Sequence, residues 1–225
     1  MSSKKKSQPL TFDTESLRTE LAAFLDTEWT DDSELPARKI GDYKFGVYAF
    51  FDYDGEPIYV GQTNEKVRTR IRRHLTNQRT DAVAMNVLDP FEVREIEVWP
   101  LPGFQSLPTK DAGAKEHLDA LEAKIYEQAI EESSFGAILN EKPPPSPTIK
   151  VTPPKSFRGR IVAENVYAIR HHPDYRIARR SQVIARLAQV IAERKVQPGL
   201  RHTLLVQAKR LEWLASRRLD ECQSD

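Results

Sequence analysis

Residues 46–74 read GVYAFFDYDGEPIYVGQTNEKVRTRIRRH, two short apolar runs followed by a basic stretch. The runs, over 45–51 and 57–61, have the length and the aromatic and branched residues of strands. Between them stands DYDG (52–55), and an Asp-Gly pair flanked by strand-like runs is a strong signal for a β-hairpin. We therefore expect a two-stranded hairpin that leads directly into a helix.

Alternation within the hairpin directs Tyr48 and Tyr59 toward the same side of a small sheet, because successive side chains of a strand point to opposite faces. One tyrosine in a strand is ordinary. Two of them, each in a tripeptide with glycine and both followed by a basic helix, favour a functional role.

The basic stretch over 65–78 has the periodicity of an amphipathic helix. Its inward stripe consists of Val67, Ile71 and Leu75. Arg70 and His74 are four residues apart and therefore share one face, one turn from each other. A guanidinium is suited to a phosphate, and an imidazole can donate to phosphoryl oxygen or hold a proton. For Lys66, Arg72 and Arg73, a solvated basic surface is the simpler interpretation.

Further along, residues 91–100 predict a third strand and residues 114–133 a long helix with an apolar stripe. Glu122 falls within that stripe, whereas Glu127 lies well round the helix. A carboxylate on an apolar face needs a partner, because an unpaired buried charge is costly. A metal ion or a nearby arginine would supply one.

Gly46-Val47-Tyr48 and Tyr59-Val60-Gly61, with Arg70 and His74 behind them, resemble the motifs of the GIY-YIG endonucleases. The resemblance spans about residues 44–141. It implies an α+β fold in which a small three-stranded sheet, mixed or antiparallel, is flanked by helices, here with a C-terminal helical extension. Arg70 stands one residue later than in the family pattern, which leaves Arg68 as a rival.

The resemblance also implies roles for individual side chains. Tyr48 would be the general base for water, its phenol made more acidic by nearby positive charge, and Tyr59 would assist it. Arg70 would bind the scissile phosphate, with His74 as a supporting donor or proton relay. Glu122 would hold one Mg²⁺ or Mn²⁺ ion.

The long interval between Glu122 and Asn140, the asparagine that matches the family pattern, leaves Glu127 as an alternative metal ligand. DNA contacts are expected from Arg68, Arg72, Arg73 and Asn140.

Composition bounds the wider interpretation. The chain has 225 residues, 39% hydrophobic and 30% charged, without an apolar run of membrane-spanning length. Its N-terminus lacks the apolar core of a signal peptide, and its single cysteine, Cys222, excludes an internal disulfide. We therefore expect a cytoplasmic protein without membrane association.

Charge is distributed unevenly along the chain. Residues 155–225 hold 15 Lys and Arg against 7 Asp and Glu, a net of +8, and the remainder has a net of −7. Such asymmetry suggests that one part faces a polyanion, although solvated arginines on helix surfaces would explain it equally well.

These patterns divide the chain into four segments. We expect an N-terminal tail and helix (1–40), a catalytic domain (41–141), a proline-rich linker (142–156) and a basic helical extension for DNA contact or oligomerisation (157–225).

The function expected is a metal-dependent DNA endonuclease, most like a small type II restriction enzyme that acts on double-stranded DNA as a homodimer or tetramer. A structure-specific nuclease of repair or recombination and a non-catalytic DNA-binding module are the alternatives.

Overall fold

The computed structural model describes residues 12–31, 36–76 and 87–224. The first residues of the expected N-terminal tail and helix, 1–11, lie outside the described residues. None of the described helices is long and apolar enough to cross a membrane.

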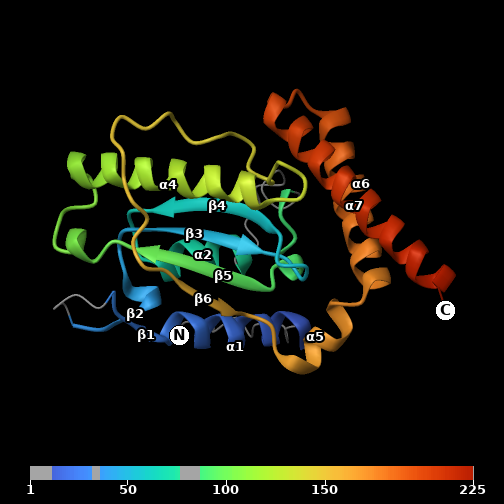
Figure 1. Cartoon of the computed structure of the whole chain (residues 1–225), viewed down its shortest axis with the longest axis horizontal. Coiled ribbons are helices and arrows are strands. Elements are labelled where there is room, and N and C mark those ends of the chain that lie inside the picture. The colour runs from blue at the N-terminus through green and yellow to red at the C-terminus, as the bar shows by residue number, and fades with distance from the viewer. Residues whose placement is uncertain (1–11, 32–35, 77–86, 225) are drawn as a thin grey trace, which may run out of the picture.

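The fold is α+β, as predicted, and its centre is an antiparallel sheet (Figure 1). The spatial order of the strands is β4-β3-β5-β6, with each neighbouring pair antiparallel. The strands are β3 (Gly46–Phe51), β4 (Pro57–Thr63), β5 (Glu95–Pro100) and β6 (Phe157–Arg160). The first three were predicted. The fourth comes from beyond the proline-rich segment, so the C-terminal part of the chain completes the sheet.

The predicted hairpin is formed by β3 and β4, and its turn is held by Asp52. The Asp52 Oδ1 atom accepts the backbone N–H groups of Asp54 at 2.9 Å and Glu56 at 3.1 Å. Gly55 has φ of +79°, a conformation that glycine adopts without steric cost. Because β3 is central, all of its residues are buried.

Helices cover both faces of the sheet. On one face lie α1 (Phe12–Asp26) and α2 (Val67–Leu75), whose buried stripes join Tyr48 and Phe50 of β3 in one core. On the other face lies α4 (Ala112–Glu132), which packs against Val47 and Ala49. Each fully buried aliphatic side chain of such a core contributes roughly 2 kcal/mol. The apolar stripes predicted for α2 and α4 are thus the faces that these two helices bury against the sheet.

Short elements connect this framework. They are the two-stranded pair β1 (Glu28–Trp29) and β2 (Arg38–Lys39), and the 3₁₀ turns η1 (Ile40–Asp42), η2 (Pro90–Glu92) and η3 (Pro102–Phe104).

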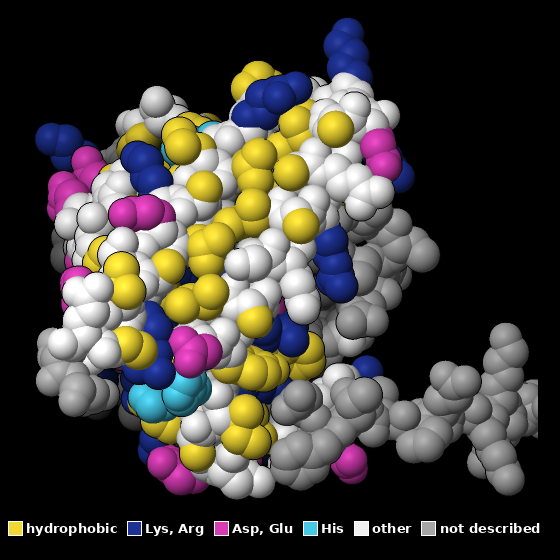
Figure 2. Space-filling model, turned by 90° about the vertical axis from the view of Figure 1, so that its right-hand side faces the viewer, with side chains coloured by type: hydrophobic (Ala, Val, Ile, Leu, Met, Phe, Trp, Pro, Cys, Tyr) yellow, Lys and Arg dark blue, Asp and Glu magenta, His cyan; other side chains and the backbone are white. Residues whose placement is uncertain are grey.

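Three helices end the chain: α5 (Glu164–Arg170), α6 (Pro173–Glu193) and α7 (Pro198–Ser224). The last two pair with each other and lie at the turn end of the β3–β4 hairpin (Figure 1). Their outward side shows a band of hydrophobic side chains, with basic side chains scattered rather than gathered in one patch (Figure 2). Leu205 and Leu219 are exposed on α7.

Buried ion pairs attach these helices to the hairpin turn. The Asp52 Oδ2 atom accepts from Arg210 and lies 3.4 Å from Arg176 Nη2 and 3.7 Å from Arg180 Nη2. Arg180 Nε also donates to Glu92 at 3.1 Å. All five side chains are almost completely buried. The positively charged C-terminal part thus pairs with acidic residues of this same chain. This pairing accounts for the charge asymmetry in a different way from the binding of an external polyanion.

Candidate active site

Tyr48 lies at the centre of the predicted constellation. Its phenol oxygen is 3.0 Å from His74 Nε2 and accepts a hydrogen bond from Arg70 Nε at 3.3 Å. Since Arg70 can only donate, the phenol hydrogen is left for His74. The hairpin and α2 therefore bring three predicted residues into direct contact, and the i, i+4 spacing of Arg70 and His74 is what allows both to reach one oxygen.

Gly61 makes room for this arrangement. In the sheet, Gly61 stands opposite Tyr48, and a Cβ atom at Gly61 would lie only 2.6 Å from Tyr48 Oη. Any larger residue would displace the hydroxyl from Arg70 and His74. The glycine that ends the second tripeptide is therefore required by the position of the tyrosine in the first.

Tyr59 completes an aromatic group on the same face, as alternation predicted. Its ring stacks on Tyr48 with centroids 6.4 Å apart and lies 5.3 Å from the ring of His74. Tyr59 is partly buried, whereas Tyr48 has no exposed surface. Tyr59 thus shields one side of the Tyr48 phenol and stays closer to solvent.

Burial has the largest effect on the pKa values of Tyr48 and His74. It raises the pKa of Tyr48, the nearby Tyr59 raises it further, and the Arg70 charge opposes both. The expectation that positive charge makes the Tyr48 phenol more acidic is wrong for the protein alone, because burial outweighs Arg70. Burial, followed by the charges of Arg70 and Arg73, lowers the pKa of His74 to about 4. His74 is therefore neutral at pH 7, and its Nε2 atom can accept the Tyr48 proton.

Glu122 approaches the site from α4. Burial and then the neighbouring Asp119 raise the pKa of Glu122 to about 7, against a hydrogen bond from Gln62 and the charges of Arg70 and Lys115. The Glu122 charge in turn helps to raise the pKa of Tyr48 and Tyr59.

Glu127, the alternative to Glu122, has a different environment. Its side chain is 59% exposed and pairs with Lys124 at 2.9 Å. Because it is on a solvated part of α4 and already has a cation, Glu127 lacks the surroundings that distinguish Glu122.

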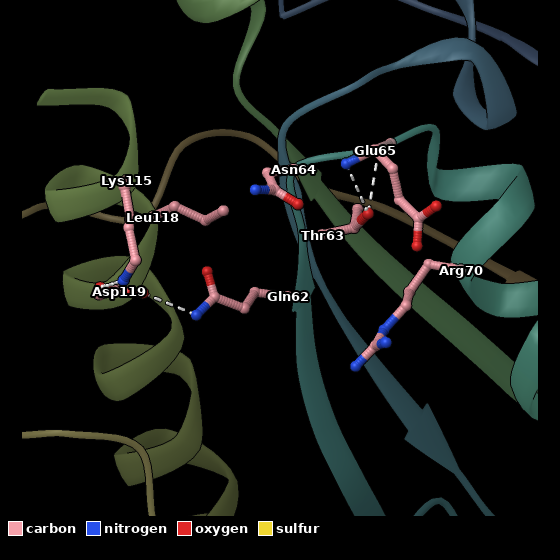
Figure 3. A pocket seen from close by; sticks show the side chains of 8 residues that line it. All are labelled: Gln62, Thr63, Asn64, Glu65, Arg70, Lys115, Leu118 and Asp119. Carbon is pink, nitrogen blue, oxygen red and sulfur yellow. Dashed lines mark hydrogen bonds and ion pairs between the residues drawn. The ribbon is translucent and has the colours of Figure 1, made fainter. Parts of the chain in front are cut away.

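A cavity of about 220 Å³ opens beside these residues (Figure 3). Arg70 and Glu65 stand on its α2 side, and Lys115, Leu118 and Asp119 on its α4 side. The end of β4 and the residues after it form the base between them, with Gln62, Thr63 and Asn64. Gln62 Nε2 donates to Asp119 Oδ1 at 2.7 Å, so this hydrogen bond connects the base of the cavity to its α4 side.

The residues expected to contact DNA are not brought to this cavity. Arg68 Nη2 pairs with Asp26 at 2.7 Å, and Arg73 Nη2 pairs with Glu65 at 2.8 Å. Arg72 is exposed. Their DNA contacts stay predictions. Of the two arginines left open by the sequence, Arg70 contacts Tyr48 and Arg68 pairs with Asp26.

Asn140 binds the edge of β4. Its Oδ1 accepts the Val60 N–H at 3.0 Å, and its Nδ2 donates to the Val60 carbonyl at 2.7 Å. The side-chain amide thus replaces a neighbouring strand and covers part of an open sheet edge. A contact of Asn140 with DNA also stays a prediction.

Sequence reasoning missed Gln62, Lys115 and Asp119. A signal was present for two of them, because Gln62 directly follows the second tripeptide and Asp119 is three residues before Glu122 on the same helix. Within the described residues, no group of three or more His, Cys, Asp or Glu side chains is placed to hold a metal ion.

Comparison with protein families matches residues 44–129 to the family described as the GIY-YIG catalytic domain. Residues 44–129 are thus a GIY-YIG catalytic domain. This domain indicates a DNA endonuclease, and nucleases with this domain generally depend on a divalent metal ion. The match begins just before β3 and ends within α4, so it contains all of the side chains that surround Tyr48. Searches of curated proteins and of solved structures gave no match.

Proposed function

We propose that this GIY-YIG nuclease cleaves double-stranded DNA with Mg²⁺ or Mn²⁺ as cofactor and acts as a type II-like restriction enzyme. The observation that carries the proposal is the Tyr48 hydroxyl held between His74 and Arg70, of which Arg70 also lines a cavity. The Glu122 charge acts on the same phenol.

Tyr48 and His74 would activate the attacking water together. The water passes a proton to the Tyr48 oxygen as the phenol hydrogen moves to His74 Nε2, 3.0 Å away. A buried tyrosine alone is a poor base, and this transfer avoids a free phenolate. A bound phosphate adds negative charge beside His74, which raises the basicity of the imidazole when a proton has to be taken up.

Arg70 would bind the scissile phosphate, because its guanidinium lines the cavity and only its Nε is used by Tyr48. Tyr59, on the same face, would orient the phosphate or assist Tyr48.

Glu122 fits a hard divalent cation. It is a half-buried carboxylate whose raised pKa reflects burial and a second carboxylate nearby, conditions that a cation relieves. When bound there, the ion would neutralise a non-bridging oxygen and stabilise the leaving oxygen.

The packing of the C-terminal helices favours a restriction-type enzyme over the alternative functions. They dock on the catalytic domain through buried ion pairs, and the described chain forms a compact unit around one site. One site cuts one strand, so double-strand cleavage requires a homodimer or tetramer.

The test is incubation of the purified chain with plasmid DNA and Mg²⁺, beside Tyr48→Phe and Glu122→Gln. We expect discrete fragments from wild type, and a rate at least about a thousandfold lower from either variant. Glu127→Gln is the matched control and should cut like wild type.

Each other outcome has a meaning. Cleavage of branched or damaged duplexes alone would move the proposal to a repair nuclease. Loss of cutting in Glu127→Gln but not in Glu122→Gln would reverse the metal ligand. Absence of cutting by wild type on all these substrates would contradict the proposal.

A further inference from the structure

Lys115 is a cation on the active-site cavity that the chemistry above does not use. Among the side chains lining this cavity, Arg70 and Lys115 are the positively charged ones, and they stand on opposite sides of it (Figure 3). The Lys115 side chain is 65% exposed, so it has no part in the core.

The position of Lys115 is locally unfavourable. It is the fourth residue of α4, where the positive end of the helix dipole disfavours a cation. Its partner Asp119 follows at i+4, the less favourable order for a helical ion pair. A residue that is unfavourable for its helix and gains no buried packing in exchange is expected mainly at functional sites.

The ion pair with Asp119 can be exchanged at little cost. It is solvated on the Lys115 side, and exposed pairs of this kind contribute little to stability. Asp119 would keep a partner, because its Oδ1 atom already accepts from Gln62 at 2.7 Å. The ammonium group is therefore available to another anion at the same cavity.

We propose that Lys115 binds the DNA backbone phosphate next to the scissile phosphate, on the α4 side of the cavity. This inference rests on the proposed function, in which Arg70 holds the scissile phosphate on the α2 side. A phosphodiester strand that crosses the base of the cavity from α2 to α4 meets Arg70 first and Lys115 next. The contact is to phosphate alone, so it adds affinity and not sequence preference.

Binding measurements test the contact directly. A labelled DNA duplex is titrated with full-length Tyr48→Phe protein in EDTA at several salt concentrations, with and without Lys115→Met. Loss of one phosphate contact should lower the slope of log K against log salt by about 0.9 and weaken binding about tenfold at low salt. Lys115→Arg should restore both values. The matched control is Lys124→Met, which removes an exposed lysine of the same helix that pairs with Glu127 outside the cavity.

Cleavage kinetics in the otherwise wild-type chain separate this role from others. Lys115→Met should raise KM about tenfold with kcat within about twofold, since a flanking contact is equally strong in ground and transition states. A fall in kcat at unchanged KM would overturn the proposal and assign Lys115 to the reacting group. A salt slope equal to that of Lys124→Met, or no measurable binding by the parent, would also overturn it. A chain that shows the slope change but cuts no DNA would retain the phosphate contact and refute the proposed function.

Discussion

Two arginine-rich helices of this chain look alike in sequence and do opposite things. Residues 70–73 read RIRR in α2, and residues 176–180 read RIARR in α6. Arg70 faces a phenol oxygen and an open cavity, whereas Arg176 and Arg180 are buried against carboxylates. Both segments place several arginines around an isoleucine on a helix. What differs is whether the arginine forms an ion pair with a carboxylate from a distant part of the chain.

This comparison explains the charge asymmetry. A net of +8 over residues 155–225 would ordinarily suggest a nucleic-acid surface. Here many of those arginines pair with acidic side chains of this same chain. The acidic partners include Asp52, Asp54, Asp89, Glu92, Glu95 and Asp174. Arg70, which donates to Tyr48 and lines the cavity, instead lies in the part of the chain that has a negative net charge.

The largest effect is expected at the buried cluster, from Asp52→Asn. Asp52 Oδ1 holds the hairpin turn, and Asp52 Oδ2 is shared by three buried arginines. Removing the charge leaves these guanidinium groups short of a partner in a dry interface, which should cost about 3 to 5 kcal/mol of unfolding free energy. Urea denaturation followed by circular dichroism measures it.

An exposed pair provides the matched control for Asp52→Asn. Asp174→Asn removes a carboxylate that is 59% exposed and pairs with Arg218 on the same two helices. Its denaturation midpoint should be close to that of wild type. If Asp52→Asn and Asp174→Asn lowered the free energy of unfolding equally, burial would not be what makes the Asp52 ion pairs important for stability.

The next effect is expected at the active site, from Gly61→Ala. The added methyl group would lie 2.6 Å from Tyr48 Oη and must push the hydroxyl away from Arg70 and His74. We expect kcat to fall about a hundredfold, equivalent to about 2.7 kcal/mol, because small displacements of a reacting group are costly.

Gly103→Ala is the control for that substitution, because a Cβ atom at Gly103 meets nothing within 4 Å. It should cut DNA at the wild-type rate. A Gly61→Ala enzyme as active as Gly103→Ala would show that the exact position of the Tyr48 oxygen is unimportant.

The sequence was sufficient for the parts of the fold and site that depend on local pattern. The Asp-Gly turn, the Val67, Ile71 and Leu75 stripe, and the spacing of Arg70 and His74 are set by neighbours a few residues apart, and all were predicted. The GIY-YIG resemblance followed from the same short segments.

The parts that sequence reasoning missed depend on remote partners. Strand β6 reads FRGR, without apolar alternation, and pairs with β5 partly through Arg158 and Glu95. Gly159 faces Phe24 of α1, since a Cβ atom there would lie 3.0 Å from the Phe24 ring. Nothing within residues 157–160 encodes these contacts. The acidity of Tyr48 was missed for the same reason, because burial is a property of the whole fold.

The smallest effect concerns pH, and it is expected at the cluster around Tyr48, where folding changes the acidity of His74. Folding lowers the pKa of His74 from 6.5 to about 4, so the unfolded chain binds a proton between those values that the folded chain does not. The contribution of neutral His74 to stability is therefore complete above pH 6.5 and is lost as the pH falls toward 4. At pH 5 the loss relative to pH 7 should be about 2 kcal/mol.

Urea denaturation of wild type and His74→Gln at pH 7, 6 and 5 measures this difference. The variant retains every other titrating group, so subtraction isolates the imidazole, and wild type should lose about 2 kcal/mol more than the variant between pH 7 and pH 5. Parallel curves would mean that folding leaves the pKa of His74 near its ordinary value of 6.5. In that case burial beside Tyr48 would not be what keeps the imidazole neutral, and a protonated fraction of His74 unable to accept the Tyr48 proton would grow as the pH falls below 6.5.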